Sequence, residues 1–226
     1  MAEAALKRGP GRGRFVTFEG GEGAGKSTQI KMLADRLENE GVRVVLTREP
    51  GGSPGAEIMR HLVLSGMGKL LGPEAETLLF AAARDDHVRN VILPALNQGS
   101  WVLCDRFFDS TRAYQGSQGK VAPDVLNAMQ RVTIGDLKPD LTVILDVPAE
   151  VGMKRAADRR GNGAPDRFEG EDIKFHQGLR GAFRKIAADE PKRCVLIDAR
   201  ASAEAVSHIV WDAVRERLFT AVAAAS

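Results

Sequence analysis

Eight consecutive residues, Gly20 to Ser27, match the pattern G-x-x-x-x-G-K-[ST] of a phosphate-binding loop. An apolar run precedes this loop and an amphipathic helical pattern follows it, which is the context that the motif requires. Its glycines let backbone N–H groups turn toward phosphate oxygens, and the N-terminus of the following helix attracts anions. We expect Lys26 to bridge the β- and γ-phosphates of ATP and the Ser27 hydroxyl to bind Mg²⁺. The expected nucleotide-binding residues are Gly20, Gly21, Glu22, Gly23, Ala24, Gly25, Lys26, Ser27 and Thr28.

Glu22 places a carboxylate inside a loop that should hold a polyanion. Because like charges repel, its side chain should project away from the phosphates, toward the second substrate. A sugar hydroxyl, an arginine or hydrated Mg²⁺ could pair with it there. The alternative is a solvated carboxylate without a specific role.

The type of nucleotide-dependent protein follows partly from what the sequence lacks. The guanine-reading pattern Asn-Lys-x-Asp of a GTP-driven switch does not occur in the 226 residues. Motor ATPases usually need a longer chain. A kinase for a small acceptor is therefore the leading interpretation.

The elements that position this loop follow an alternation of strand and helix. Most of the short apolar runs are nearly continuous, as expected for strands covered on both faces. The predicted strands are Phe15–Phe18, Val42–Leu46, Trp101–Cys104, Leu141–Val147 and Cys194–Ile197. Between the first two runs, Ile30, Leu33, Ala34 and Leu37 share a helical face and Gly41 follows as a stop; similar patterns occupy about 55–66, 73–97, 122–135, 149–157, 171–189 and 202–222. This order predicts an α/β fold with a doubly wound, five-stranded parallel sheet, whose ligand site lies at the carboxyl ends of the strands.

Three further clusters fall at such ends or on adjoining helices, and they concern the second substrate. They are "TREPGG" with Arg48 and Pro50, "LLFAAARDDH" with Phe80 and Arg84, and "CDRFFDSTRAYQG" with Asp105, Arg106, Thr111, Tyr114 and Gln115. Phe80 and Arg84 are four residues apart and so share a helical face. Arginines suit an acceptor that carries its own phosphate, since the guanidinium group binds phosphate in a bidentate manner.

Together with the phosphate loop, these clusters resemble the thymidylate kinase family, including its nucleoside monophosphate kinase-like fold. The phosphate loop alone is generic, whereas the Arg-Glu-Pro, Phe-x-x-x-Arg and Asp-Arg-(x)4-Thr-x-x-Tyr-Gln set is much more specific. The resemblance extends over about 200 residues. It implies transfer of the ATP γ-phosphoryl group to dTMP, a step in dTTP synthesis, and a homodimer.

The resemblance also implies roles for individual residues. Arg106 is the first candidate for holding the acceptor phosphate and Arg48 the second. Phe80 would stack on the base and Arg84 would donate to a pyrimidine carbonyl, with Thr111 and Gln115 as further polar contacts. Tyr114 would pack on the sugar and disfavour a ribose 2′-hydroxyl, and Glu22 would contact the 3′-hydroxyl or a metal-bound water. Taken singly, Phe80 and Tyr114 could be core residues, and each arginine could be a surface ion-pair partner.

Residues 158–170, "DRRGNGAPDRFEG", lie between two helical patterns and are interpreted as a lid. The phosphate loop contains no arginine, so the sequence resembles the bacterial type of the family, in which the lid supplies the catalytic arginine. Arg159 or Arg160, with Arg167, would then stabilise the transition state, and the sequence does not choose between the first two. For the metal, Asp105 is favoured over Asp146 because it adjoins Arg106.

Composition limits the remaining possibilities. The formal net charge is +2; residues 1–14 alone carry +3, and the rest of the chain sums to −1. A nucleic-acid-binding face is therefore not indicated. Residues 1–14 are interpreted as a disordered basic leader before a single domain at 15–226. No run is apolar for the ~18 residues of a membrane span, and Cys104 and Cys194 lie in apolar runs, which favours a cytoplasmic protein without structural disulfides. The alternatives are a kinase for another monophosphate or deoxynucleoside, and a nucleotide-gated binding module without enzymatic activity.

Overall fold

A five-stranded parallel sheet forms the centre of the computed structural model, which describes residues 11–67, 70, 72–161, 163 and 167–219. The strands are β1 (Phe15–Glu19), β2 (Val44–Arg48), β3 (Trp101–Asp105), β4 (Leu141–Asp146) and β5 (Cys194–Asp198). Their order in the sheet is β2-β3-β1-β4-β5, and every neighbouring pair is parallel. The predicted fold class is therefore confirmed. The one clear shift is β2, which begins and ends two residues later than the predicted run.

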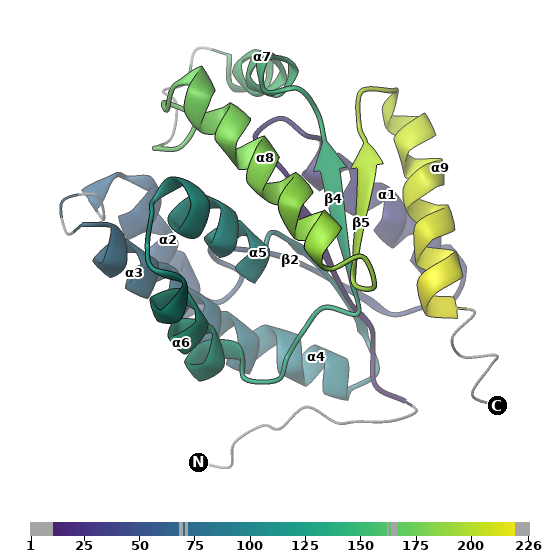
Figure 1. Cartoon of the computed structure of the whole chain (residues 1–226). Helices are drawn as coiled ribbons and strands as arrows, with labels where there is room; N and C mark the ends of the chain where they lie inside the picture. The colour runs from purple at the N-terminus through teal and green to yellow at the C-terminus, as the bar shows by residue number, and fades with distance from the viewer. Residues whose placement is uncertain (1–10, 68–69, 71, 162, 164–166, 220–226) are drawn as a thin grey trace.

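Helices cover both faces of this sheet (Figure 1). They are α1 (Lys26–Asn39), α2 (Pro54–Leu64), α3 (Pro73–His87), α4 (Leu93–Asn97), α5 (Phe108–Thr111), α6 (Pro123–Ile134), α7 (Ala149–Arg160), α8 (Ile173–Asp189) and α9 (Ala203–Val214), with π-helical stretches η2 (Val88–Ile92), η3 (Arg112–Gln118) and η4 (Arg215–Phe219). Proline occupies the first turn of α2, α3 and α6, where its missing N–H removes no helical hydrogen bond. The Asp172 and Ser202 side chains cap α8 and α9.

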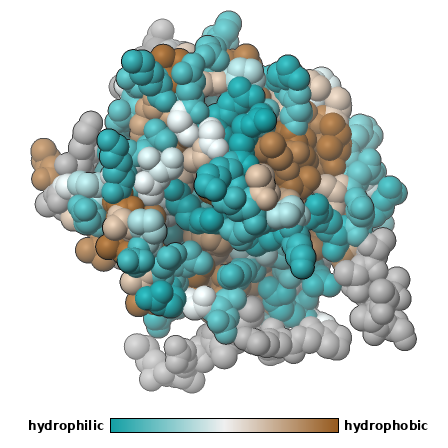
Figure 2. All heavy atoms as spheres, in the orientation of Figure 1, coloured by the Kyte–Doolittle hydropathy of each residue, from teal (hydrophilic) through white to brown (hydrophobic). Residues whose placement is uncertain are grey.

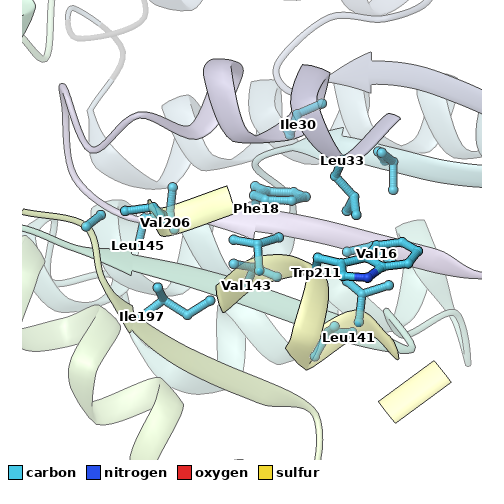
Figure 3. Packing of buried hydrophobic residues seen from close by; sticks show 14 of the residues in the cluster. Val16, Phe18, Ile30, Leu33, Leu141, Val143, Leu145, Ile197, Val206 and Trp211 are labelled. Atoms are coloured by element: carbon cyan, nitrogen blue, oxygen red, sulfur yellow. The ribbon is translucent and has the colours of Figure 1, made fainter. Parts of the chain in front are cut away.

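The core divides at the sheet because successive side chains of a strand point to opposite faces. On one face, Val16 and Phe18 of β1 pack with Leu33 of α1 and Trp211 of α9 (Figure 3). On the other face, Phe15 packs beneath the helices that follow β2 and β3. Thr17 faces the same way, and its hydroxyl lies 2.8 Å from that of Thr142 on β4. The sheet therefore rests on two separate apolar layers.

The segment after β3 is helical, which the sequence prediction missed. Residues 108–118 form α5 and η3, directly after Asp105 and Arg106. The predicted helix at 73–97 is α3, η2 and α4 in succession. The extra helix after β3 matters for the site because it presents Thr111, Tyr114 and Gln115 from one short element.

Every strand ends at its carboxyl end in a charged residue. These residues are Glu19, Arg48, Asp105, Asp146 and Asp198. In a parallel sheet these ends lie along one edge, where the loops gather. The sheet thus brings the chemistry-bearing clusters to a common edge.

The predicted leader lies mostly outside the described residues, and its last residues pack on the domain. The Arg12 guanidinium donates to Asp140 at 2.9 Å, and the N–H of Gly13 donates to the Leu96 carbonyl at 2.9 Å. The packed chain therefore begins before the predicted boundary at Phe15. Both cysteines are buried and unbonded to each other, as expected.

The surface seen in Figure 2 is mainly hydrophilic, with apolar residues gathered beside α9 and β5. Leu196 of β5 and Ile209 of α9 are among the exposed apolar side chains. Within the described ranges, no helix combines the length and the apolar character needed to cross a bilayer.

Candidate active site

The phosphate loop runs from β1 directly into the first turn of α1. Gly25 caps this helix with φ 93°, a left-handed conformation that glycine adopts without strain. The Lys26 ammonium donates to the carbonyls of Gly20 and Gly21 at 3.2 and 3.0 Å. Burial lowers the pKa of Lys26, and the nearby Arg106 charge acts in the same direction. The loop thus holds a buried cation at the helix N-terminus, as phosphate binding requires.

Ser27 and Asp105 meet beside this loop. The Ser27 hydroxyl donates to Asp105 Oδ2 at 2.7 Å, although the two residues are 78 positions apart. Asp146, the competing candidate, is instead held by Arg180 at 2.7 and 2.9 Å and by Arg184 at 2.9 Å. No group of three His, Cys, Asp or Glu side chains in the described chain forms a complete metal site. A hydroxyl and one carboxylate suit Mg²⁺, which usually takes its other ligands from water and substrate phosphates.

Glu22 turns its side chain away from the loop interior, as the charge argument predicts. Its Oε1 accepts from Arg106 Nη2 at 2.7 Å and from the Tyr114 hydroxyl at 2.9 Å. Burial acts to raise the pKa of Glu22, but the charges of Arg106 and Lys26 outweigh it and lower the pKa to about 2. The carboxylate is therefore ionised at neutral pH, and an arginine is its partner.

A cavity of about 220 Å³ opens on the far side of Glu22. It is lined by Glu22, Glu49, Pro50, Arg60, Leu64, Phe80, Arg84, Arg106, Phe107, Ser110, Thr111, Tyr114, Gln115, Arg159, Phe168 and Glu169. All the predicted substrate-binding residues except Arg48 are in this set. Residues from segments far apart in the sequence are thus brought together at one pocket.

Arg84 forms part of the floor of this pocket and is 6% exposed. Its Nε donates to Glu49 Oε2 at 2.7 Å, and its Nη2 donates to the Thr111 hydroxyl at 3.1 Å. The other Glu49 oxygen lies 3.1 Å from Nδ1 of the fully buried His87, whose Nε2 lies 2.6 Å from the Thr47 hydroxyl. Sequence reasoning missed Glu49 and His87 as supports of Arg84, because their contact depends on how α3 packs beside β2.

Aromatic side chains line the same pocket. The Phe80 ring, which is half-buried, lies 6.2 Å from Phe168, and the Tyr114 ring lies 5.0 Å from Phe168. Gln115 is buried, and its Nε2 donates to Glu76 at 3.4 Å. The pocket therefore combines apolar ring surfaces with polar groups at a few positions, as small-molecule sites commonly do.

Arg48 does not join this site. Its side chain is 54% exposed and pairs with Glu57 at 2.9 Å, outside the acceptor cavity. The strand direction explains this, because Arg48 and Glu49 point to opposite sides and only Glu49 turns inward. Arg60 of α2 lines the cavity instead, and its Nη1 donates to the Pro50 carbonyl at 2.6 Å. No sequence signal singled out Arg60, since its position depends on the docking of α2.

The three predicted lid arginines have different partners. Arg159 and Arg160, at the end of α7, both contact Glu169, at 3.4 and 2.8 Å. Arg167 lies with its Nε 3.0 Å from Glu76 Oε2, but the N–H is not directed at that oxygen. Of the three, only Arg159 lines the acceptor cavity. Residues 162 and 164–166 of the predicted lid lie outside the described residues.

Comparisons with known proteins agree with this geometry. A family model described as thymidylate kinase matches residues 18–210. A thymidylate kinase of Bradyrhizobium sp. (strain ORS 278) is 92% identical over 226 residues, which are 100% of both chains. One from Rhodopseudomonas palustris (strain BisB18) is 73% identical, over 92% of this chain and 90% of that relative. The crystal structure of thymidylate kinase from Ehrlichia chaffeensis has a TM-score of 0.73 and 33% identity, covering 90% of this chain and 99% of that chain. The chain therefore belongs to the thymidylate kinase family and is an ATP-dependent kinase that phosphorylates dTMP to dTDP.

Proposed function

We propose that the cavity beside Glu22 binds dTMP, with its phosphate held by Arg106 next to the phosphate loop. The observation that carries this proposal is the contact of Glu22 with Arg106 and Tyr114, at 2.7 and 2.9 Å. Through these contacts, a residue of the phosphate loop touches both Arg106, the proposed phosphate-binding residue, and the Tyr114 side chain of the acceptor pocket. Arg60 is proposed as a second cation for the acceptor phosphate, in place of Arg48, because it lines the same cavity.

The donor side would use the loop backbone and Lys26 for the ATP phosphates. Ser27 and Asp105, 2.7 Å apart, would hold Mg²⁺, whose charge neutralises developing negative charge on the phosphates when it is bound. Asp146 is disfavoured for this role because its oxygens already accept from Arg180 and Arg184. Arg155 donates to the carbonyls of Ala199 and Arg200, which supports a place for the adenine beside these residues.

The base would stack on Phe80, and Arg84 would donate to a pyrimidine carbonyl from the pocket floor. Thr111 and Gln115 offer further polar contacts, and a base that misfits would leave these buried groups unpaired. Tyr114 would pack on the sugar. Its hydroxyl donates to Glu22, which would hold the ring where it crowds a ribose 2′-hydroxyl.

Phosphoryl transfer then depends on positioning and on positive charge around the transferring group. A phosphate monoester has its second pKa near 6, so the acceptor is ionised at neutral pH and no strong general base is needed. Arg159 is the lid residue best placed to approach the transferring group, since it lines the acceptor cavity. Arg160 and Arg167 would support the closed lid through Glu169 and Glu76.

A coupled ADP-release assay with ATP, Mg²⁺ and a panel of dTMP, dUMP, CMP and AMP tests the proposed pocket. We expect dTMP to be preferred strongly over CMP and AMP. Appreciable turnover of AMP would contradict the assignment of Phe80, Arg84 and Gln115 to the base.

Glu22→Gln tests the carboxylate at the centre of the proposal. It should lower kcat/KM for dTMP by about 10-fold or more while ATP binding changes much less, because the hydrogen bonds of the Glu22 side chain go to Arg106 and Tyr114 on the acceptor side. Glu57→Gln is the matched control, since Glu57 pairs with the exposed Arg48 outside the cavity. Equal effects of Glu22→Gln on both substrates would argue against the assignment.

We also propose a homodimer in the cytoplasm. Exposed apolar residues on adjoining helices, Ile58 of α2, Leu78 of α3 and Val132 of α6, support a contact face there. Light scattering on the purified chain, with Leu78→Glu as the disrupting variant, measures this directly.

A further inference from the structure

Glu19 is a fully buried carboxylate that the mechanism above does not use. It ends β1 and directly precedes the phosphate loop. Its Oε1 accepts from the N–H groups of Phe107 and Ser110 at 2.8 and 3.3 Å, and its Oε2 accepts from the Ser110 hydroxyl at 2.6 Å. A buried carboxylate is costly unless such donors satisfy it, so its presence under the pocket needs a reason.

The backbone that Glu19 holds is the one that carries Arg106. Arg106 has φ 71°, which is uncommon for a residue with a side chain and costs free energy. Its N–H donates to the Phe18 carbonyl at 2.9 Å, and the next N–H along the chain, that of Phe107, donates to Glu19. The strained residue is therefore held on both sides by the last two residues of β1.

Glu19 also reaches the Arg106 side chain through Ser110. The Ser110 hydroxyl donates to Glu19 and accepts from Arg106 Nη1 at 3.2 Å. The same Nη1 donates to the carbonyl of Gly20 at 3.1 Å. The guanidinium group is therefore oriented directly by Gly20 and indirectly, through Ser110, by Glu19. Nη2 of Arg106 is left for Glu22, on the pocket side.

A second buried carboxylate in the same turn provides a contrast. Asp109 is also fully buried, but it faces away from the pocket and pairs with Arg193 at 2.6 and 3.0 Å and with Arg112 at 3.0 Å. None of these three residues lines the acceptor cavity. Asp109 therefore stabilises the turn, whereas Glu19 is directed at Arg106.

We propose that Glu19 is a positioning residue for Arg106, which fixes the strained backbone of Arg106 through Phe107 and the guanidinium group through Ser110. Because Glu19 is also joined to Gly20, it sets the distance between the acceptor clamp and the donor loop. This inference rests on the proposed role of Arg106 as the phosphate clamp.

Glu19→Gln tests it, with Asp109→Asn as the matched control. The amide keeps the size of the side chain and one acceptor oxygen, but its NH₂ group only donates, so the side chain can no longer accept from both the backbone N–H groups and the Ser110 hydroxyl. Assayed above pH 8, where the Glu19 carboxylate is ionised, Glu19→Gln should lower kcat/KM for dTMP by about 10-fold or more, with KM for ATP changed by less than about threefold. Asp109→Asn should lower the melting temperature while both kinetic constants of the folded enzyme stay near those of the wild type.

Ser110→Ala is the second variant, because it leaves the backbone contacts of Glu19 in place. It should raise KM for dTMP by a few-fold with little effect on ATP, since only the link to the guanidinium group is lost. Wild-type kinetics in folded Glu19→Gln, or in Ser110→Ala, would overturn the inference. So would a loss in Glu19→Gln that falls equally on both substrates, as in a merely destabilised protein. Arg106→Ala distinguishes a failure of this inference from a failure of the proposed function. If Arg106→Ala kept wild-type activity, the assignment of Arg106 to the acceptor phosphate would itself be wrong.

Discussion

The floor of the acceptor pocket and the lid both carry arginines, but the two regions hold them differently. Arg84 and Arg106 on the floor are mostly buried, and each has several fixed partners. Arg159 at the lid is 64% exposed, and it shares one carboxylate, Glu169, with Arg160. The floor is therefore arranged during folding, whereas under the proposed mechanism the lid arginines would exchange Glu169 for a phosphate.

This difference separates binding from catalysis. Under the proposed assignment, preorganised groups on the floor would interact with the acceptor in the ground state and in the transition state alike, so their removal should raise KM with little change in kcat. Lid groups that leave an existing partner gain most when charge develops in the transition state, so they should affect mainly kcat.

The largest expected effect is that of Arg106→Ala. We expect kcat/KM for dTMP to fall by about three orders of magnitude, because the acceptor clamp is lost and Glu22 stays buried without its charged partner. Arg106→Lys should restore little, since an ammonium group cannot make the bidentate contacts of the guanidinium group. Steady-state kinetics with each substrate varied in turn measure this. Recovery by lysine would mean that charge alone matters at this position.

The lid arginines should give the next largest effect. Arg159→Ala should lower kcat by about 10²-fold with KM for dTMP little changed, as for removal of a transition-state contact. Arg167→Ala should instead act through stability and KM, because its partner Glu76 also contacts Gln115 on the floor. Single-turnover measurements distinguish the two. If Arg159→Ala, Arg160→Ala and Arg167→Ala all kept wild-type turnover, the catalytic role of the lid would be wrong.

The floor should also give the protein a pH-dependent stability. Burial and the charge of Asp109 raise the pKa of Glu19 to about 8, against the hydrogen bonds from Ser110 and Phe107 and the charge of Arg106, which lower it. The folded state then binds this proton more tightly than the unfolded state, whose pKa is near 4.5. The contribution of Glu19 to the free energy of unfolding therefore declines as the pH rises from 4.5 to 8, by at most about 1.4 kcal/mol per pH unit.

Urea unfolding of the wild type and Glu19→Gln at pH 5, 6, 7 and 8 measures that slope. The free energy of unfolding of the wild type, relative to that of Glu19→Gln, should decrease as the pH rises. Glu22, with its pKa lowered to about 2, has the opposite sign and loses its contribution only below pH 4.5. A constant difference over this range would show that Glu19 is ionised throughout.

The sequence predicted the donor side of the site better than the acceptor side. The phosphate loop is contiguous and acts through its backbone, so Gly20 to Ser27 could be found from their spacing. The acceptor pocket depends on packing between distant segments. The side chains of Arg84 and Arg106 were predicted through family-like motifs. Arg60, Glu76 and the contact of Glu49 with Arg84 became visible only when α2 and α3 were placed on the sheet. The charge argument also gave the direction of Glu22, because repulsion from phosphate does not depend on the fold.

Arg48 and Arg60 give the smallest and most discriminating comparison. Arg48→Ala should change kcat/KM for dTMP by less than about twofold and the free energy of unfolding by at most about 0.5 kcal/mol, because an exposed ion pair contributes little. Arg60→Ala should raise KM for dTMP by about 10-fold, since it removes a cation that lines the cavity and donates to the Pro50 carbonyl. The two arginines lie on adjoining segments with the same charge, so global electrostatics cannot explain a difference between them. If Arg48→Ala had the larger effect, α2 and the loop after β2 would have to rearrange when dTMP binds, and the acceptor pocket would be less preorganised than its floor.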